Sequence, residues 1–177
     1  FDIPESSLLK IKYNIPKDRY ILGSFQRDTE GKDKISPKLS KGPDRFIEIV
    51  KKMAEKKKIF VLLAGHRRQY IIRLLEKYKI EYLYYEKVSF EELNELYNCL
   101  DLYIVSSRIE GGPQSIFECG LSKTPIISTD VGIAKKVLAT ESIFDMKNFQ
   151  SAQPNVEFAY QNSIIFDIPK GFEEFNK

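Results

Sequence analysis

Residues 108–118 read Arg108-Ile109-Glu110-Gly111-Gly112-Pro113-Gln114-Ser115-Ile116-Phe117-Glu118. The apolar run 102–105 before this stretch predicts a buried strand, and the pattern after it predicts a helix that reaches residue 123. Pro113 is expected at the first helical position, where its missing N–H costs nothing. A strand, a glycine turn and a helix N-terminus favour anion binding, because the first backbone N–H groups lack partners and the helix dipole adds positive charge.

Two carboxylates flank this anion site. Glu110 stands at the end of the strand, and Glu118 lies about one and a half turns into the helix. A carboxylate offers two acceptor oxygens to hydroxyl donors. An anion docked on the turn, with a carboxylate on each side, suggests a nucleotide sugar as the ligand.

Apolar runs and amphipathic helical patterns alternate along the 177 residues, a length that suits one domain. The sequence predicts strands at 20–25, 59–64, 81–85, 102–105 and 125–129, with helices at 44–56, 69–78 and 89–100. This alternation favours an α/β fold: a Rossmann-like three-layer α/β/α sandwich with a mostly parallel sheet of about six strands. Ligands of such sheets bind beyond the carboxyl ends of the strands, so the loops there should open on one edge.

Three segments fit this alternation less well. Residues 27–43 form a long charged insert that predicts a mobile loop, and the pattern weakens beyond residue 138. Residues 156–160 are predicted as either a short last strand or a helical segment. Residues 171–175 are predicted to begin a helix.

The spacing of Glu110 and Glu118 resembles the E-x7-E motif of retaining, nucleotide-sugar-dependent glycosyltransferases of the group 1 (family 4) type, which have the GT-B fold. The resemblance runs from about residue 21 to 138 and includes segments 101–107 and 125–132, and Lys41-Gly42 within segment 40–44. Such enzymes pair an N-terminal acceptor domain with a C-terminal donor domain. The resemblance implies that residues 1–177 are a single nucleotide-sugar-binding domain, the C-terminal half of a GT-B fold, without the acceptor domain.

The resemblance also assigns roles to charged residues. Glu118 would accept hydrogen bonds from the ribose hydroxyls, and Glu110 would hold hydroxyls of the donor sugar. Lys41 and an arginine would neutralise the diphosphate leaving group, where charge develops as the glycosidic bond breaks. Arg27 is the best candidate for that arginine, and the alternatives are Arg67 and Arg68.

Further donor-binding residues follow from the same resemblance. Gly111 and Gly112 would let the backbone approach the sugar and phosphate, and Pro113, Gln114 and Ser115 would present the helix start. Gly65 and His66, at the carboxyl edge of the sheet, are predicted to line the site, with a capping or surface role as the alternative. Tyr85 and Phe90 either wall the base pocket or, as the favoured reading, pack in the core.

The sequence contains no Asp-x-Asp pair and no Walker loop. The resemblance therefore implies that no metal and no other cofactor is needed, and that arginine, lysine and the helix dipole hold the diphosphate.

The charge pattern bears on partners and location. The 28 basic and 25 acidic residues are mixed along the chain, and no nucleic-acid recognition motif is present. The basic run at Lys51, Lys52 and 56–58 reads as a solvated helix face, with anionic lipid headgroups as the alternative partner. Cys99 and Cys119 are expected to be buried thiols, which suits a cytoplasmic protein, with the inner face of the membrane as a second placement. No apolar run is long enough to cross a bilayer.

The resemblance thus implies part of a retaining hexosyltransferase whose partners are a nucleotide sugar and, through the missing domain, a polysaccharide or lipid-linked acceptor. This part alone is expected to be inactive. A GT-B-type sugar-nucleotide epimerase and a non-catalytic GT-B-like binding module are the alternatives.

Overall fold

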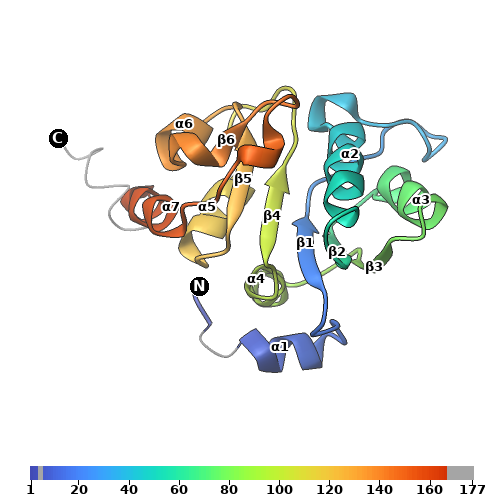
Figure 1. Ribbon diagram of the computed structural model, residues 1–177, viewed down its shortest axis with the longest axis horizontal. Coiled ribbons are helices and arrows are strands. Elements are labelled where there is room, and N and C mark those ends of the chain that lie inside the picture. Colours follow the sequence, from blue (N-terminus) through green and yellow to red (C-terminus); the bar gives the residue numbers. More distant parts are fainter. Residues whose placement is uncertain (4–5, 167–177) are drawn as a thin grey trace.

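A computed structural model describes residues 1–3 and 6–166, and the strands within them form one six-stranded sheet (Figure 1). The strand order is β3-β2-β1-β4-β5-β6, and each neighbouring pair is parallel. The strands are β1 (Tyr20–Ser24), β2 (Ile59–Ala64), β3 (Glu81–Tyr85), β4 (Leu102–Val105), β5 (Ile126–Thr129) and β6 (Ile143–Phe144). The predicted α/β fold with a parallel sheet is confirmed. The strand order reverses between β1 and β4, which is where such sheets bind ligands.

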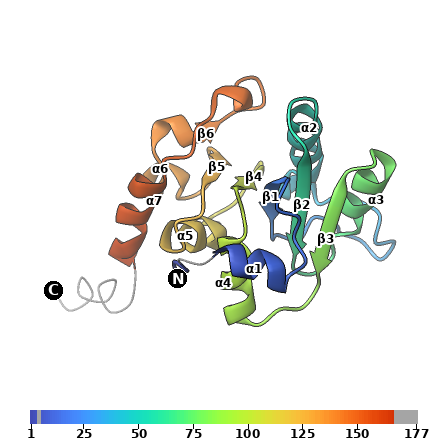
Figure 2. The same ribbon diagram turned by 60° about the horizontal axis from the view of Figure 1, so that its bottom comes forward.

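Helices cover both faces of this sheet. One face carries α2 (Pro43–Ala54) and α3 (Gln69–Lys77), and the other carries α1 (Ser6–Lys12), α4 (Phe90–Asn98), α5 (Gln114–Leu121), α6 (Ala134–Val137) and α7 (Val156–Ser163). Strand side chains alternate between two cores, so Leu62 belongs to the core on the side of α4 and α5, while Val61 and Leu63 belong to the core on the side of α2 and α3. Figure 2 shows α1 lying beside α4, and Figure 1 shows α3 and α7 at opposite ends of the molecule.

The C-terminal part differs from the sequence prediction. The last strand among the described residues is β6, whereas residues 156–160 belong to helix α7, so the strand alternative for that segment is wrong. The side chain of Asn155 caps this helix by accepting a hydrogen bond from the Phe158 N–H at 3.1 Å. Short 3-10 turns, η2 (Thr140–Ser142), η3 (Phe149–Ser151) and η4 (Ile164–Phe166), complete the segment. The helix predicted at 171–175 lies outside the described residues.

The long insert after β1 is anchored at its base. The N–H groups of Asp28 and Thr29 donate to the Arg67 carbonyl at 3.2 and 3.1 Å, and Thr29 pairs with Pro37 in an antiparallel bridge. Asp28 and Thr29 are buried, while residues 30–35 are exposed. The tip of the insert is therefore exposed while its base is packed, and the mobility of residues 27–43 stays a prediction. The insert ends in η1 (Leu39–Lys41), directly before α2.

Candidate functional site

A cavity of about 470 Å³ lies at the carboxyl edge of the sheet, beside the point where the strand order reverses. Its lining comes from the loop after β1, from η1, α4 and β4, and from the turn into α5: Phe25, Gln26, Lys41, Leu93, Tyr97, Tyr103, Glu110, Gly112, Pro113, Gln114, Ser115 and Glu118. Most of the site residues predicted from the sequence therefore share one cavity.

Lys41 and Glu110 are the charged pair of this cavity. The Lys41 Nζ makes an ion pair with the Glu110 Oε1, and both side chains are largely buried. Burial lowers the pKa of Lys41, and the charge of Lys38 lowers it further. The Glu110 carboxylate opposes both effects because an opposite charge favours the ammonium form. The other carboxylate oxygen, Oε2, is buried and has no hydrogen-bond partner within the described residues.

The position of Lys41 follows from a tight backbone contact. Gly42 has a φ of 63°, and a Cβ there would lie 1.9 Å from the Ser106 carbonyl oxygen. The Ser106 hydroxyl donates to the Gly42 carbonyl at 2.8 Å, and the Arg108 N–H donates to the Ser40 carbonyl at 2.8 Å. The Arg108 guanidinium also contacts both carboxylate oxygens of Asp44, at 2.7 and 2.6 Å. The junction of η1 and α2 is thus fastened to the loop after β4, which carries Glu110.

Helix α5 begins one position later than the sequence predicts. Pro113 has an extended ψ of 114° and occupies the N-cap, so its expected place as first helical residue is wrong and Gln114 takes it. Gly111 and Gly112 are exposed, and a Cβ at Gly111 would meet nothing within 4 Å. A Cβ at Gly132, in contrast, would lie 2.4 Å from the Gly111 carbonyl oxygen. The loop after β5 therefore packs against the backbone of the Gly111–Gly112 turn, while the space beside the Gly111 Cα stays open.

Three aromatic side chains form the wall next to Glu118, and none of them was predicted as a site residue. The rings of Phe25, Tyr97 and Tyr103 lie 4.8–5.4 Å apart. The Tyr97 hydroxyl donates to the Glu118 Oε2 at 2.6 Å, and the Tyr103 hydroxyl accepts from the Phe25 N–H at 2.9 Å. Tyr97 belongs to the apolar stripe of α4, a pattern that predicts core packing alone.

Gln26 is a fourth cavity residue that sequence reasoning missed. Its side-chain Nε2 donates to the Lys41 carbonyl at 3.0 Å, and its Oε1 accepts from the Ser107 hydroxyl at 3.3 Å. Gln26 therefore joins the loops after β1 and β4 to the segment that carries Lys41.

Several predicted residues do not line the cavity. Arg27 is exposed, and its Nε donates to the Thr29 carbonyl at 2.9 Å. Gly65, with a φ of 90°, turns the chain after β2, and His66 is exposed with its Nδ1 3.6 Å from the Glu86 carboxylate. These positions lie at the same sheet edge, outside the cavity itself.

The alternative arginines are occupied elsewhere. Arg67 donates to the Gly31 carbonyl at 3.2 Å. Arg68 is fully buried, with its Nε 2.9 Å from the Asp28 carboxylate and its Nη2 donating to the Ser24 hydroxyl at 3.1 Å. Arg68 thus holds the base of the loop after β1.

Phe90 and Tyr85 also lie outside the cavity. Phe90 is 89% exposed as the first residue of α4, so its expected core packing is wrong, because the capped helix start points this side chain to solvent. Tyr85 is half-buried and packs edge-on against Tyr13, with ring centroids 5.6 Å apart. Cys99 and Cys119 are buried free thiols, as predicted.

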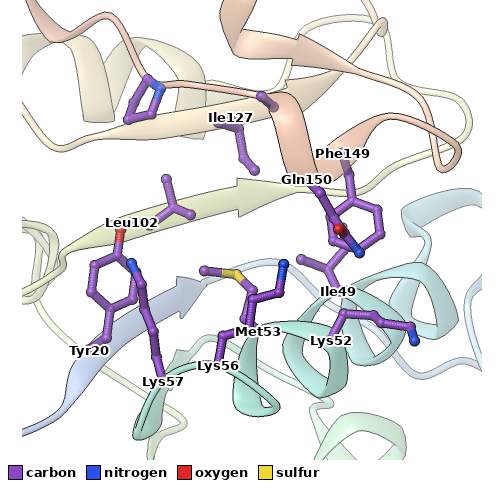
Figure 3. A pocket seen from close by; sticks show the side chains of 12 residues that line it. Tyr20, Ile49, Lys52, Met53, Lys56, Lys57, Leu102, Ile127, Phe149 and Gln150 are labelled. Atoms are coloured by element: carbon purple, nitrogen blue, oxygen red, sulfur yellow. The ribbon is translucent and has the colours of Figure 1, made fainter.

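A second cavity, of about 240 Å³, lies at the opposite edge of the sheet, between α2 and η3 (Figure 3). Lys52, Lys56 and Lys57 line it together with Phe149 and Gln150, and the Lys57 ammonium lies over the Tyr20 ring, 3.9 Å from its centroid. Basic side chains thus border an apolar floor formed by residues such as Leu102 and Ile127. Among the helices that the structure describes, none is both long and apolar enough to cross a membrane.

Comparisons with solved structures place this fold. The C-terminal domain of the group 1 glycosyl transferase LpcC from Francisella tularensis matches with a TM-score of 0.74 and 16% identity, over 95% of this chain and 96% of that one. A glycosyltransferase from Rickettsia africae gives 0.73 and 17%, over 98% and 51%. HepE from Anabaena, in complex with UDP and glucose, gives 0.70 and 16%, over 99% and 54%. The chain spans about half the length of the last two proteins.

No curated protein matches the chain by sequence. The family model described as "Glycosyl transferases group 1", however, matches residues 34–173, which is most of the chain. These residues include η1, the turn into α5 and both glutamates of the cavity. The chain therefore belongs to the group 1 glycosyltransferase family, and its sheet and helices form a GT-B-type domain.

Proposed function

We propose that this chain is the donor half of a retaining glycosyltransferase, which binds a nucleoside-diphosphate hexose for transfer to a polysaccharide or glycolipid acceptor. The observation that carries the proposal is the single cavity that gathers Lys41, Glu110, the α5 N-terminus and Glu118. Membership of the family supports transferase chemistry. The UDP and glucose in the HepE complex support the class of ligand, because the two folds agree.

Each side chain has a role that its chemistry suits. The Lys41 ammonium and the first N–H groups of α5 would stabilise the diphosphate as it gains charge on bond cleavage. The unpartnered Oε2 of Glu110 would accept a hydroxyl of the donor sugar. Glu118 would accept the ribose hydroxyls. Gly111 and Gly112, with open space beside Gly111, would let phosphate and sugar approach the backbone.

Arg27 is proposed as the second cation. Its guanidinium lies on the exposed loop after β1, so contact with a diphosphate requires this loop to turn toward the cavity. Gly65 and His66 would then border the same loop. We propose that no metal takes part, since Lys41 already supplies a positive charge inside the cavity.

The acceptor is assigned to a second domain. The glycosyltransferase from Rickettsia africae and HepE are about twice as long as this chain, which supports a partner domain that binds a sugar or lipid-linked acceptor. We place the enzyme in the cytoplasm, at the inner face of the membrane. The lysines beside the second cavity would meet anionic lipid there, and co-sedimentation with anionic but not zwitterionic vesicles tests this placement.

A thermal-shift panel of UDP-, GDP-, ADP- and CMP-sugars tests the donor proposal. One nucleotide class should raise the melting temperature, and the shift should persist in EDTA. Glu118→Ala should abolish most of that shift, because a charged hydrogen bond contributes about 1.5–3 kcal/mol. No shift with any nucleotide would favour the non-catalytic binding module. Turnover of the sugar nucleotide by the full-length protein without an acceptor would favour an epimerase.

A further inference from the structure

The Glu118 carboxylate is held by one oxygen only. Its Oε2 accepts the Tyr97 hydroxyl at 2.6 Å, whereas Oε1 makes no hydrogen bond within the described residues. Glu118 itself lines the cavity. One oxygen is therefore fixed against the protein, and the other is left for a hydroxyl donor that enters the cavity.

We propose that Tyr97 is the positioning residue for ribose recognition: its hydroxyl orients the Glu118 carboxylate so that Oε1 meets the ribose 2′-hydroxyl of the donor. This inference rests on the proposed function, because it takes the cavity ligand to be a nucleotide. It adds a residue from α4, outside the turn and helix that carry both glutamates.

Tyr97 is a rigid support for this contact. Its side chain is 2% exposed, and its ring lies 4.8 Å from the Phe25 ring and 5.4 Å from the Tyr103 ring. Its carbonyl accepts the Thr124 hydroxyl at 3.0 Å, which ties this end of α4 to the loop after α5. A side chain packed on three sides has few other rotamers to occupy, so its hydroxyl stays at one place.

The chemistry of the contact favours a fixed donor. Burial raises the pKa of Tyr97 well above its ordinary value, so the phenol keeps its proton at every physiological pH. A buried hydroxyl needs a partner, and Glu118 is the one that it has. A carboxylate whose orientation is already fixed binds a hydroxyl better than a freely rotating carboxylate, because it loses less rotational freedom on binding. The ribose preference should therefore depend on the Tyr97 hydroxyl.

Paired titrations of the chain with UDP and dUDP, GDP and dGDP, and ADP and dADP measure the 2′-hydroxyl contribution for any base. The native chain should bind the ribonucleotide about tenfold more tightly than its deoxy form, the effect of one hydrogen bond to a charged group. In Tyr97→Phe, which keeps the ring, the deoxy affinity should stay and the ribonucleotide affinity should fall, so that the ratio drops at least about threefold. Purely structural damage would instead lower both affinities equally.

Tyr85→Phe is the matched control, since it removes a half-buried hydroxyl that bonds the Tyr13 carbonyl away from the cavity. The ratio of ribonucleotide to deoxyribonucleotide affinity in Tyr85→Phe should equal that of the native chain. If Tyr97→Phe does not fold, Tyr97→Met, a smaller and flexible side chain without a hydroxyl donor, is read in the same way. If the Tyr97 variant keeps the native ratio of ribonucleotide to deoxyribonucleotide affinity while Glu118→Gln loses it, the role of Tyr97 is overturned and the ribose contact of Glu118 stands. No ribose preference in the native chain would overturn the proposed ribose contact as well.

Discussion

Lys41 is the residue whose charge the proposed mechanism needs most. Lys41→Ala should weaken nucleoside diphosphate binding by about 1.5–3 kcal/mol and leave nucleoside binding nearly unchanged, because only the diphosphate meets the ammonium. Calorimetry measures both affinities, with UDP and uridine or with the diphosphate and nucleoside of whichever base the thermal-shift panel identifies.

Lys38→Ala is the control for this prediction. Lys38 lies close enough to lower the pKa of Lys41 but does not line the cavity, so its removal should have little effect on diphosphate binding. Equal losses for the diphosphate and the nucleoside in Lys41→Ala would indicate a folding defect and contradict the proposed contact.

Individual residues show where sequence reasoning works. Lys41 and Glu110 are 69 positions apart, yet both follow elements that end at the carboxyl edge, so their shared cavity could be predicted. Tyr97 could not, because a tyrosine in an apolar helix stripe looks the same whether its hydroxyl faces solvent or a carboxylate. The choice among three arginines also depended on the fold, since Arg68 meets its partner Asp28 only through loop packing.

The contact between the η1–α2 junction and the loop after β4 should be intolerant of any added side chain. Gly42→Ala would place a Cβ 1.9 Å from the Ser106 carbonyl oxygen at a φ of 63°, so it should lower the free energy of unfolding by more than about 1 kcal/mol. Gly111→Ala, with open space around it, should leave that free energy unchanged. Chemical denaturation of both variants measures this contrast, and equal stabilities would contradict the packing at Gly42.

The same contact should depend on pH through Asp44. Hydrogen bonds from Arg108 lower the pKa of Asp44 below its ordinary value of 3.8. The ion pair therefore contributes fully above pH 3.8 and loses its contribution as the pH falls through the lowered value. Arg108→Met should lower the melting temperature by up to about 4 °C at pH 7. The difference in melting temperature between the native chain and this variant should become smaller below pH 3.8.

Lys32→Met, in the exposed part of the insert, should show no such pH dependence. A gap for Arg108→Met that stays constant down to pH 2.5 would mean that lost packing, and not the pair with Asp44, causes the effect.

At the scale of elements, the sequence predicts long periodic segments well and short ones poorly. Helix α3 and strand β2 lie within a residue of their predicted bounds, because each has a clear apolar pattern. Strand β6 has two residues and, within the described part of the chain, pairs only with β5, so no periodic pattern marks it. The segment that forms α7 is compatible with a helix or a strand from sequence alone, because a short apolar segment fits either until its packing on α5 is known.

On the proposed function, the whole molecule supplies the donor side of a binding site, and a second domain supplies the acceptor side. Transfer requires donor and acceptor to be held together and shielded from water, which accounts for about 7–11 kcal/mol of a typical barrier. We expect these 177 residues to bind the nucleotide sugar and to transfer nothing, with activity only in a protein that includes the acceptor domain. A radiolabelled-sugar assay with purified acceptor, run on both proteins, measures this, and sustained transfer by the chain alone would show that it is complete.

The burial of both cysteines makes this chain convenient for fluorescence work. Thiol reagents attack the thiolate, but burial raises the pKa of Cys99 to about 12 and that of Cys119 well above its ordinary value, and neither sulfur faces solvent. A maleimide dye should therefore react only with a cysteine introduced on the surface. Ile109, 76% exposed beside Glu110, offers a position from which such a dye would report nucleotide binding without removal of either native cysteine.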